Sequence, residues 1–191
     1  KEYGVIHKTD EQKCLATYPL DSGDIPTKVL SPKQYHLLSH QLNPKFRLKS
    51  ILSYQEFLNH RYSPEDILDN TRAALNEGER VLIGVLIPAL DYAGAEGRFK
   101  VSHDTWVLST PILDKLKDLY HHPLYFGGHQ MIITGYNDKA FAIDSEGNIH
   151  QGLFTLRNSW GDAAGYHGYF YMSYAYLSQL SVDLKSIQLI D

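Results

Sequence analysis

A histidine and an asparagine stand at the ends of two stretches that both have the pattern of strands. His129 begins a stretch that runs to Tyr136, and Asn158 directly follows a second stretch at residues 149–157. Antiparallel pairing of the two strands brings these side chains together. An amide oxygen that accepts the distal imidazole N–H fixes the tautomer and leaves the other ring nitrogen to activate a thiol. The pair therefore has the chemistry of the orienting half of a cysteine nucleophile system, and Trp160 is placed to keep water from it.

The residues around this pair resemble the C-terminal part of the papain-like (C1) cysteine peptidases. The sequence has Gly127-Gly128-His129 before a strand that ends in Gly135-Tyr136, and Asn158-Ser159-Trp160-Gly161 after the later strand. Two weaker matches lie upstream, at Tyr18-Pro19-Leu20 and in the helix-then-strand segment at residues 72–85. All four occur in the order that the family has, so the resemblance covers most of residues 15–175.

The resemblance implies a cysteine-type peptidase, expected to be an endopeptidase, that acts on a peptide or protein substrate without a cofactor. A thiolate would attack the peptide carbonyl, His129 would protonate the leaving amine, and Asn158 would orient His129. The family's substrate cleft places Gly128 and Gln130 near the non-primed subsites and Trp160 toward the primed side. Because Gln130 stands where the family usually has a small apolar residue, a narrower or more polar S2 pocket is expected.

The nucleophile motif of the family is missing from this sequence. The only cysteine is Cys14, and Pro19 soon afterwards prevents a long helix from starting at that thiol. We therefore expect the nucleophile on a segment that precedes Lys1, and an N-terminal fragment that carries this cysteine, or a propeptide, as a partner. Two alternatives stay open: Cys14 is the nucleophile, or the protein is a catalytically inactive relative with a binding or inhibitory role.

Two helices and a series of strands are predicted, which indicates the α+β class with an open barrel or strongly curled sheet of antiparallel strands. One helix begins after the N-cap Ser63 and ends at Gly78, and the other begins at Thr110-Pro111 and ends at Pro123. The predicted strands cover residues 46–50, 81–87, 129–136, 140–144, 149–157, 168–174 and 182–190.

The resemblance implies a papain-like fold of two lobes, of which this chain supplies mainly the β-barrel lobe. Residues 1–45, with one short helix near residues 32–38, are expected to be the remainder of the helical lobe after the nucleophile helix. Residues 46–191 are expected to form the β-barrel lobe that carries His129 and Asn158. The stretch at about 94–124 has no family counterpart and is interpreted as an insertion.

Composition argues against several classes of partner. The 191 residues include 18 basic and 22 acidic side chains, with a net charge of −4 and no long run of one sign, which is unlike a surface for nucleic acid or an anionic membrane. The longest apolar run, at residues 81–87, is far shorter than the roughly 20 residues that cross a bilayer. A single cysteine excludes an intrachain disulfide. Because the family is mostly exported, a secreted or extracytoplasmic location is expected.

Other chemistry-bearing residues have simpler explanations. His121, His122 and His129 suggest a metal site, but no cysteine or carboxylate ligand pattern accompanies them and we expect no metal. Asp144 and Glu146 suggest the paired carboxylates of a glycosidase, but a turn between strands explains them better. The tyrosine-rich tract at residues 166–176 is interpreted as sheet surface.

Overall fold

A computed structural model describes residues 4–5, 46–55, 62–88, 104–118, 121 and 125–190. The chain divides into two compact units, one made of residues 1–51 with 187–191 and the other of residues 52–186. Apart from the short strand β1 (Gly4–Val5), the segment at 1–45 lies outside the described residues, and so do its predicted helix and Cys14.

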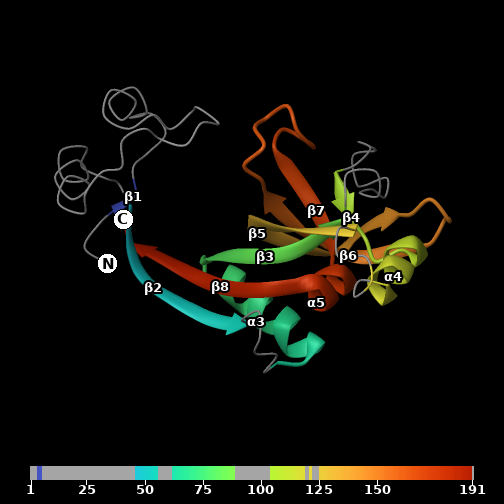
Figure 1. Cartoon of the computed structure of the whole chain (residues 1–191). Helices are drawn as coiled ribbons and strands as arrows, with labels where there is room; N and C mark the ends of the chain where they lie inside the picture. Colours follow the sequence, from blue (N-terminus) through green and yellow to red (C-terminus); the bar gives the residue numbers. More distant parts are fainter. Residues whose placement is uncertain are drawn as a thin grey trace. The chain divides into compact units, whose positions relative to one another are not determined.

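The larger unit is built on one sheet (Figure 1). Its strand order is β8-β3-β5-β6-β7-β4, and the pairs β3–β5, β5–β6 and β6–β7 are antiparallel. Among the strand pairs of this unit whose register is described, one is parallel, the pair of β4 with β7. The α+β class and the mainly antiparallel lobe predicted from the sequence are thereby confirmed. The strands are β3 (Arg80–Pro88), β4 (Thr105–Trp106), β5 (Phe126–Ile143), β6 (Ile149–Arg157), β7 (Tyr169–Ser173) and β8 (Ser181–Ile190).

The smaller unit contains β1, the first part of β2 (Phe46–Gln55), up to Ile51, and the end of β8. β1 pairs antiparallel with β2, and β2 is the neighbour of β8 in the sheet. Between these two strands, Ser50 Oγ donates a hydrogen bond to Gln188 Oε1 at 3.3 Å. The strand predicted at residues 46–50 is therefore present and five residues longer than the sequence pattern indicated.

Helix α3 (Pro64–Asn76) forms where the sequence predicts it. Ser63 caps its start: the hydroxyl accepts a hydrogen bond from Asp66 N, and the Asp66 carboxylate accepts one from Ser63 N. The helix buries Ile67, Thr71 and Ala74, which share one face at helical spacing. This face packs on β3 and on α5 (Tyr174–Leu180), beside which α3 lies in Figure 1.

The prediction of separate strands at 129–136 and 140–144 is wrong, because β5 runs continuously through both. The expected turn at Asn137 is a local irregularity in the pairing of β5 with β6. Asn137 Oδ1 accepts hydrogen bonds from Lys139 N and Ala140 N, which satisfies the backbone of the irregular residues without reversing the chain. The reversal occurs only after Ile143.

Helix α5 was not predicted, because the tyrosine-rich tract was interpreted as sheet surface. Ser173 caps the helix with its hydroxyl, which accepts a hydrogen bond from Tyr176 N. Tyr176 is fully buried, and its hydroxyl donates to Leu86 O at 2.8 Å. Burial raises the pKa of this phenol. The helix buries residues at helical spacing: Tyr176, Leu177 and Leu180. This spacing is the signal in the sequence that could have predicted α5.

Helix α4 (Thr110–Lys117) is shorter than predicted and ends at the cap residue Asp118, before Pro123. It buries Ile112. Most of the remaining insertion, at residues 94–103, 119–120 and 122–124, lies outside the described residues. Within the described residues, no helix is long and apolar enough to cross a membrane.

The core of the larger unit is contributed by the central strands together with α3 and α5. Fully buried apolar side chains at the centre of this core fix the central strands against one another. They include Val81, Ile83, Val85, Ile133, Phe154, Leu156, Met172, Leu177 and Leu184.

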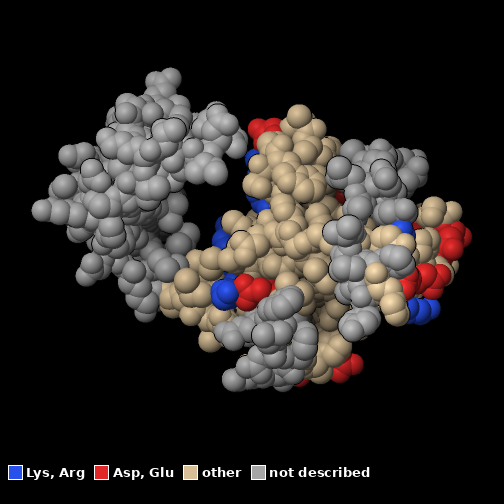
Figure 2. Space-filling model, in the orientation of Figure 1, with Lys and Arg blue, Asp and Glu red and all other residues tan. Residues whose placement is uncertain are grey.

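On the face of the molecule in Figure 2, acidic and basic side chains are interspersed among a larger uncharged area.

Candidate active site

The pairing of three strands positions the histidine. On one side of His129, β3 places Val85 directly opposite it. On the other side, β5 pairs with β6 so that Ile132 opposes Arg157. Continuing this antiparallel register by three positions puts Trp160 opposite His129. The residues that follow β6 therefore arrive next to the imidazole because of the strand register.

The His129 and Asn158 side chains are hydrogen bonded to each other. His129 Nε2 lies 2.9 Å from Asn158 Oδ1, and Ser159 N lies 2.7 Å from the same oxygen. A backbone N–H only donates, so the atom shared by these two contacts is the amide oxygen. Nε2 must then carry the proton in the neutral ring, which leaves Nδ1 as the free nitrogen. Within the described part of the chain Nδ1 has no hydrogen-bond partner.

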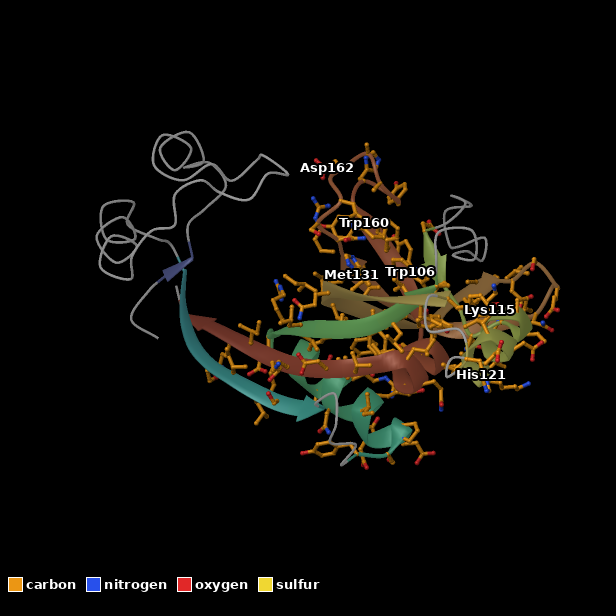
Figure 3. All side chains as sticks on the ribbon, viewed as in Figure 1. Trp106, Lys115, His121, Met131, Trp160 and Asp162 are labelled. Atoms are coloured by element: carbon orange, nitrogen blue, oxygen red, sulfur yellow. The ribbon has the colours of Figure 1, made fainter. Side chains whose placement is uncertain are left out.

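Trp160 covers this pair. Its indole stacks on the His129 ring, with centroids 4.8 Å apart and an angle of 26° between the planes. Phe170 packs against the indole in a T-shaped arrangement, at 5.5 Å and 90°, and in turn stacks on buried Trp106 at 5.0 Å. Figure 3 shows Trp160 on the segment beyond β6, with Met131 and Trp106 on the sheet below it. Trp160 itself stays 44% exposed.

Asn158 is deeply placed compared with the residues around it. It is 6% exposed, whereas His129 is half-buried. Its Oδ1 accepts two hydrogen bonds, but its Nδ2 is buried without a partner among the described residues. An unpaired buried amide nitrogen is costly to a fold, by about 1–3 kcal/mol. The position of this side chain is therefore poorly explained by stability, whereas it is well suited to holding an imidazole.

The residues predicted to bind substrate flank the histidine on β5. Gly128 is paired with Leu86 and Gln130 with Gly84, and both predicted residues are exposed. Because side chains alternate along a strand, Gln130 lies on the face of the sheet opposite to His129. Among the described residues, no atom lies within 4 Å of the position that a Cβ of Gly128 would occupy, so the described part of the chain leaves the backbone beside the imidazole open.

The described residues of the alternative sites take part in local structure. His121 lies at the α4 end of the unit, well away from Trp160 and hence from the imidazole stacked on it (Figure 3), and His121 Nδ1 pairs with Asp118 at 3.3 Å. His122 lies outside the described residues. Asp144 organises the turn after β5, because its Oδ1 accepts hydrogen bonds from Glu146 N and Asn148 N, both at 2.9 Å.

Residues 113–185, which include this site, match the model of the Peptidase C1-like family. This part of the chain is therefore similar to that family. The match confirms the resemblance that the sequence motifs indicated. A comparison with curated proteins found no match.

The chain is also similar to solved structures of papain-like proteins. Xylellain, a cysteine protease from Xylella fastidiosa, is 22% identical over 86% of this chain and 47% of its own, with a TM-score of 0.47. SERA5E from Plasmodium falciparum is 13% identical over 77% and 51%, with a TM-score of 0.45. Bromelain from Ananas comosus is 14% identical over 78% and 54%, with a TM-score of 0.43. The chain thus spans about half the length of these proteins.

Sequence reasoning gave no role to Arg157, although it directly precedes Asn158 in the papain-like segment. The structure places its guanidinium against the residues that follow Trp160, with Nη1 donating to His167 O at 2.6 Å and Nη2 to Asp162 Oδ1 at 2.7 Å. The available signal was its position between the strand and the asparagine, but the carbonyl that it contacts cannot be inferred from residue types.

Proposed function

We propose that the protein is a thiol peptidase of papain type that hydrolyses peptide bonds as an endopeptidase, with His129 as the proton carrier and Asn158 as its orienting partner. One observation carries the proposal: Asn158 Oδ1 lies 2.9 Å from His129 Nε2, and the indole of Trp160 stacks on this imidazole. The atom is identified as the amide oxygen because it accepts a hydrogen bond from Ser159 N. This arrangement selects the tautomer in which Nδ1 is available for a thiol.

In the proposed reaction a cysteine thiol gives its proton to Nδ1 of His129, and the thiolate attacks the carbonyl carbon of the peptide bond. Nδ1 then returns the proton to the leaving amine as the C–N bond breaks, which leaves a thioester. Nδ1 next accepts a proton from water as the water oxygen attacks the thioester, and it returns this proton to the sulfur that leaves. Through all these steps Asn158 keeps Nε2–H engaged, so that the ring does not rotate.

We place the nucleophile on a segment that precedes Lys1, and this segment or a propeptide is the proposed protein partner. The support is chemical: the only cysteine, Cys14, is followed so closely by Pro19 that it cannot open a long helix. The proposed substrates are peptides or proteins, bound beside the backbone of Gly128 and Gln130 on one side and beside Trp160 on the other; the Gln130 side chain lies on the opposite face of the sheet. Export from the cytoplasm is proposed from the papain-like resemblance.

The test uses the full-length protein with the sequence that precedes Lys1. Brief treatment with iodoacetamide, followed by peptide mapping, identifies which cysteine reacts fastest, and a fluorogenic peptide measures hydrolysis. We expect rapid alkylation of a cysteine before Lys1, and loss of hydrolysis by about 10²–10⁴-fold in His129→Ala. His121→Ala, which changes an exposed histidine far from Trp160, is the matched control and should keep full activity.

Three results would count against the proposal. Full hydrolysis by His129→Ala would remove the histidine from the reaction. Selective alkylation of Cys14, with loss of hydrolysis in Cys14→Ser, would show that the nucleophile is misplaced. An absence of both hydrolysis and a hyper-reactive cysteine in the full-length protein would instead identify an inactive relative that acts by binding.

A further inference from the structure

Arg157 makes three different contacts with the segment that follows Asn158. Its Nη1 donates a hydrogen bond to His167 O at 2.6 Å, and its Nη2 donates to Asp162 Oδ1 at 2.7 Å. The guanidinium also lies 4.8 Å from the centre of the Tyr169 ring. A single side chain at the end of β6 therefore contacts the segment both near its beginning and near its end.

This segment, residues 160–168, is here called the tryptophan loop, because Trp160 is its first residue. A short set of backbone hydrogen bonds closes it, among them Asn158 N to Gly168 O at 3.1 Å. His167 has a left-handed φ of 53°, which is uncommon for a residue with a side chain. Such a backbone persists only where surrounding contacts hold it. Three glycines share the left-handed region: Gly161, Gly165 and Gly168.

The contacts of Trp160 alone are too few to fix its position. Within the described residues, its indole stacks on the His129 ring and meets the Phe170 ring in a T-shaped arrangement, and it forms no hydrogen bond. It is 44% exposed, so burial holds it less firmly than it holds the fully buried residues of the core. The strand register brings Trp160 opposite His129, and the backbone of the tryptophan loop must then help to hold the ring there.

We propose that Arg157 is a positioning residue that holds the tryptophan loop closed, so that Trp160 covers the His129–Asn158 hydrogen bond. The inference rests on the proposed function, in which this bond orients the imidazole. Covering the bond excludes water and lowers the local dielectric constant, which strengthens the bond and the alignment that it imposes.

Arg157 holds the loop mainly through its hydrogen bond to His167 O and its contact with the Tyr169 ring. The Arg157–Asp162 ion pair is exposed, at 39% and 75% for the two side chains, and exposed pairs contribute little. A planar guanidinium reaches a carbonyl and a carboxylate at once while it lies over a ring, whereas a lysine ammonium does not. The space is also closely fitted, because a Cβ added to Gly168 would lie 2.6 Å from Arg157 Nη1.

The test reads the Trp160–His129 contact directly, in the chain described here. An imidazolium in contact with an indole quenches its fluorescence, so emission of Trp160 should fall as acid protonates His129. The chain has two tryptophans, and Trp160→Phe gives the background from Trp106. We expect Arg157→Met to lose most of this change in emission and Arg157→Lys to show an intermediate change.

Arg80→Lys is the matched control. Arg80 is exposed, and among the described residues it donates hydrogen bonds only to neighbouring backbone, Gly78 O at 3.3 Å and Glu79 O at 3.4 Å. A general effect of replacing an arginine would appear in this variant as well. We expect its change in emission with acid to equal that of the unmodified chain.

A folded Arg157→Met chain whose emission responds to acid as the unmodified chain does would overturn the proposal. If circular dichroism shows that Arg157→Met is unfolded, Arg157→Lys gives the answer, and an unchanged response there overturns the proposal equally. The measurement needs no peptidase activity, so a failure of the proposed function does not affect it. In an active full-length protein we further expect kcat/KM of Arg157→Met to fall by about 10- to 100-fold, as for small misplacements of catalytic groups.

Discussion

Replacing Asn158 by alanine separates the orienting role of the amide from the proton chemistry of His129. The variant loses the 2.9 Å contact with Nε2 but keeps the imidazole and the Trp160 ring stacked on it. A hydrogen bond of this kind contributes about 0.5–1.5 kcal/mol net, and about 1.4 kcal/mol of barrier corresponds to a tenfold change in rate. Loss of the bond alone therefore costs up to about tenfold.

A second loss adds to the first, because the ring without Asn158 is free to place its proton on either nitrogen. The stacked Trp160 limits rotation of the ring but does not select the tautomer. We therefore expect kcat/KM of Asn158→Ala in the full-length protein to fall about 10- to 100-fold, less than the ~10²–10⁴ expected for removal of the proton carrier in His129→Ala. The assay is hydrolysis of a fluorogenic peptide by the two variants side by side.

The stability of the same variant should change much less than its activity. Alanine removes the acceptor of the Ser159 N–H, but it also removes Nδ2, which is buried without a partner among the described residues. These effects oppose each other, so we expect Tm to move by no more than about 4 °C. Asn158→Asp keeps an acceptor oxygen in place and should retain more activity than Asn158→Ala.

Asn76→Ala is the matched control for the change of residue type. Asn76 is exposed, and its Oδ1 accepts a hydrogen bond from Tyr136 OH at 3.0 Å, away from the imidazole. Its activity should equal that of the unmodified protein. The reasoning is refuted if Asn158→Ala loses as much activity as His129→Ala or more, because the amide would then do more than orient the ring.

Two further outcomes concern the fold. Gly152→Ala should destabilise by about 2–4 kcal/mol, because φ is +84° and the new Cβ would meet the Tyr174 ring. Gly147→Ala has the same φ but no described atom within 4 Å of its Cβ position, so it should cost less. Thermal unfolding compares the two variants, and equal losses of stability would contradict this account. Burial favours protonation of Asp144, but hydrogen bonds, the first from His150, outweigh it and lower its pKa from 3.8 to about 2. The stability that this carboxylate contributes is thus present above about pH 4 and lost toward pH 2. Between pH 5 and pH 2 the Tm of Asp144→Asn should therefore fall less than that of the unmodified chain. Parallel curves of Tm against pH would contradict this assignment.

The sequence was most informative where local rules and long-range pairing agree. Ser63-Pro64 and the apolar spacing after it specify α3 without tertiary information, and the strand patterns before Asn158 and after His129 are long enough to predict their pairing. The resulting juxtaposition of the two side chains is what the structure shows at 2.9 Å. Their catalytic roles stay predictions.

The errors arose where tertiary context decides between two local readings. At Asn137 the residue types favour a turn, yet the amide oxygen satisfies the irregular backbone in place and β5 continues. At Tyr176 the aromatic residues favour a strand, yet the ring is buried and its hydroxyl reaches Leu86 O on β3. The bond from Arg157 to a backbone carbonyl depends on the loop conformation, which residue types do not specify.

The two parts of the candidate site differ in what holds them. His129 and Asn158 depend on the register of β5 with β6, and buried residues such as Ile133 and Leu156 on those strands are also core residues. A slip of one residue would move His129 to the opposite face of the sheet and expose these apolar side chains, so the geometry of the pair is protected by the stability of the core. Trp160 is less protected, because it lies on a loop and remains 44% exposed. Substitutions in the core should therefore reduce folding and activity together, whereas substitutions in the tryptophan loop should reduce activity in a chain that remains folded.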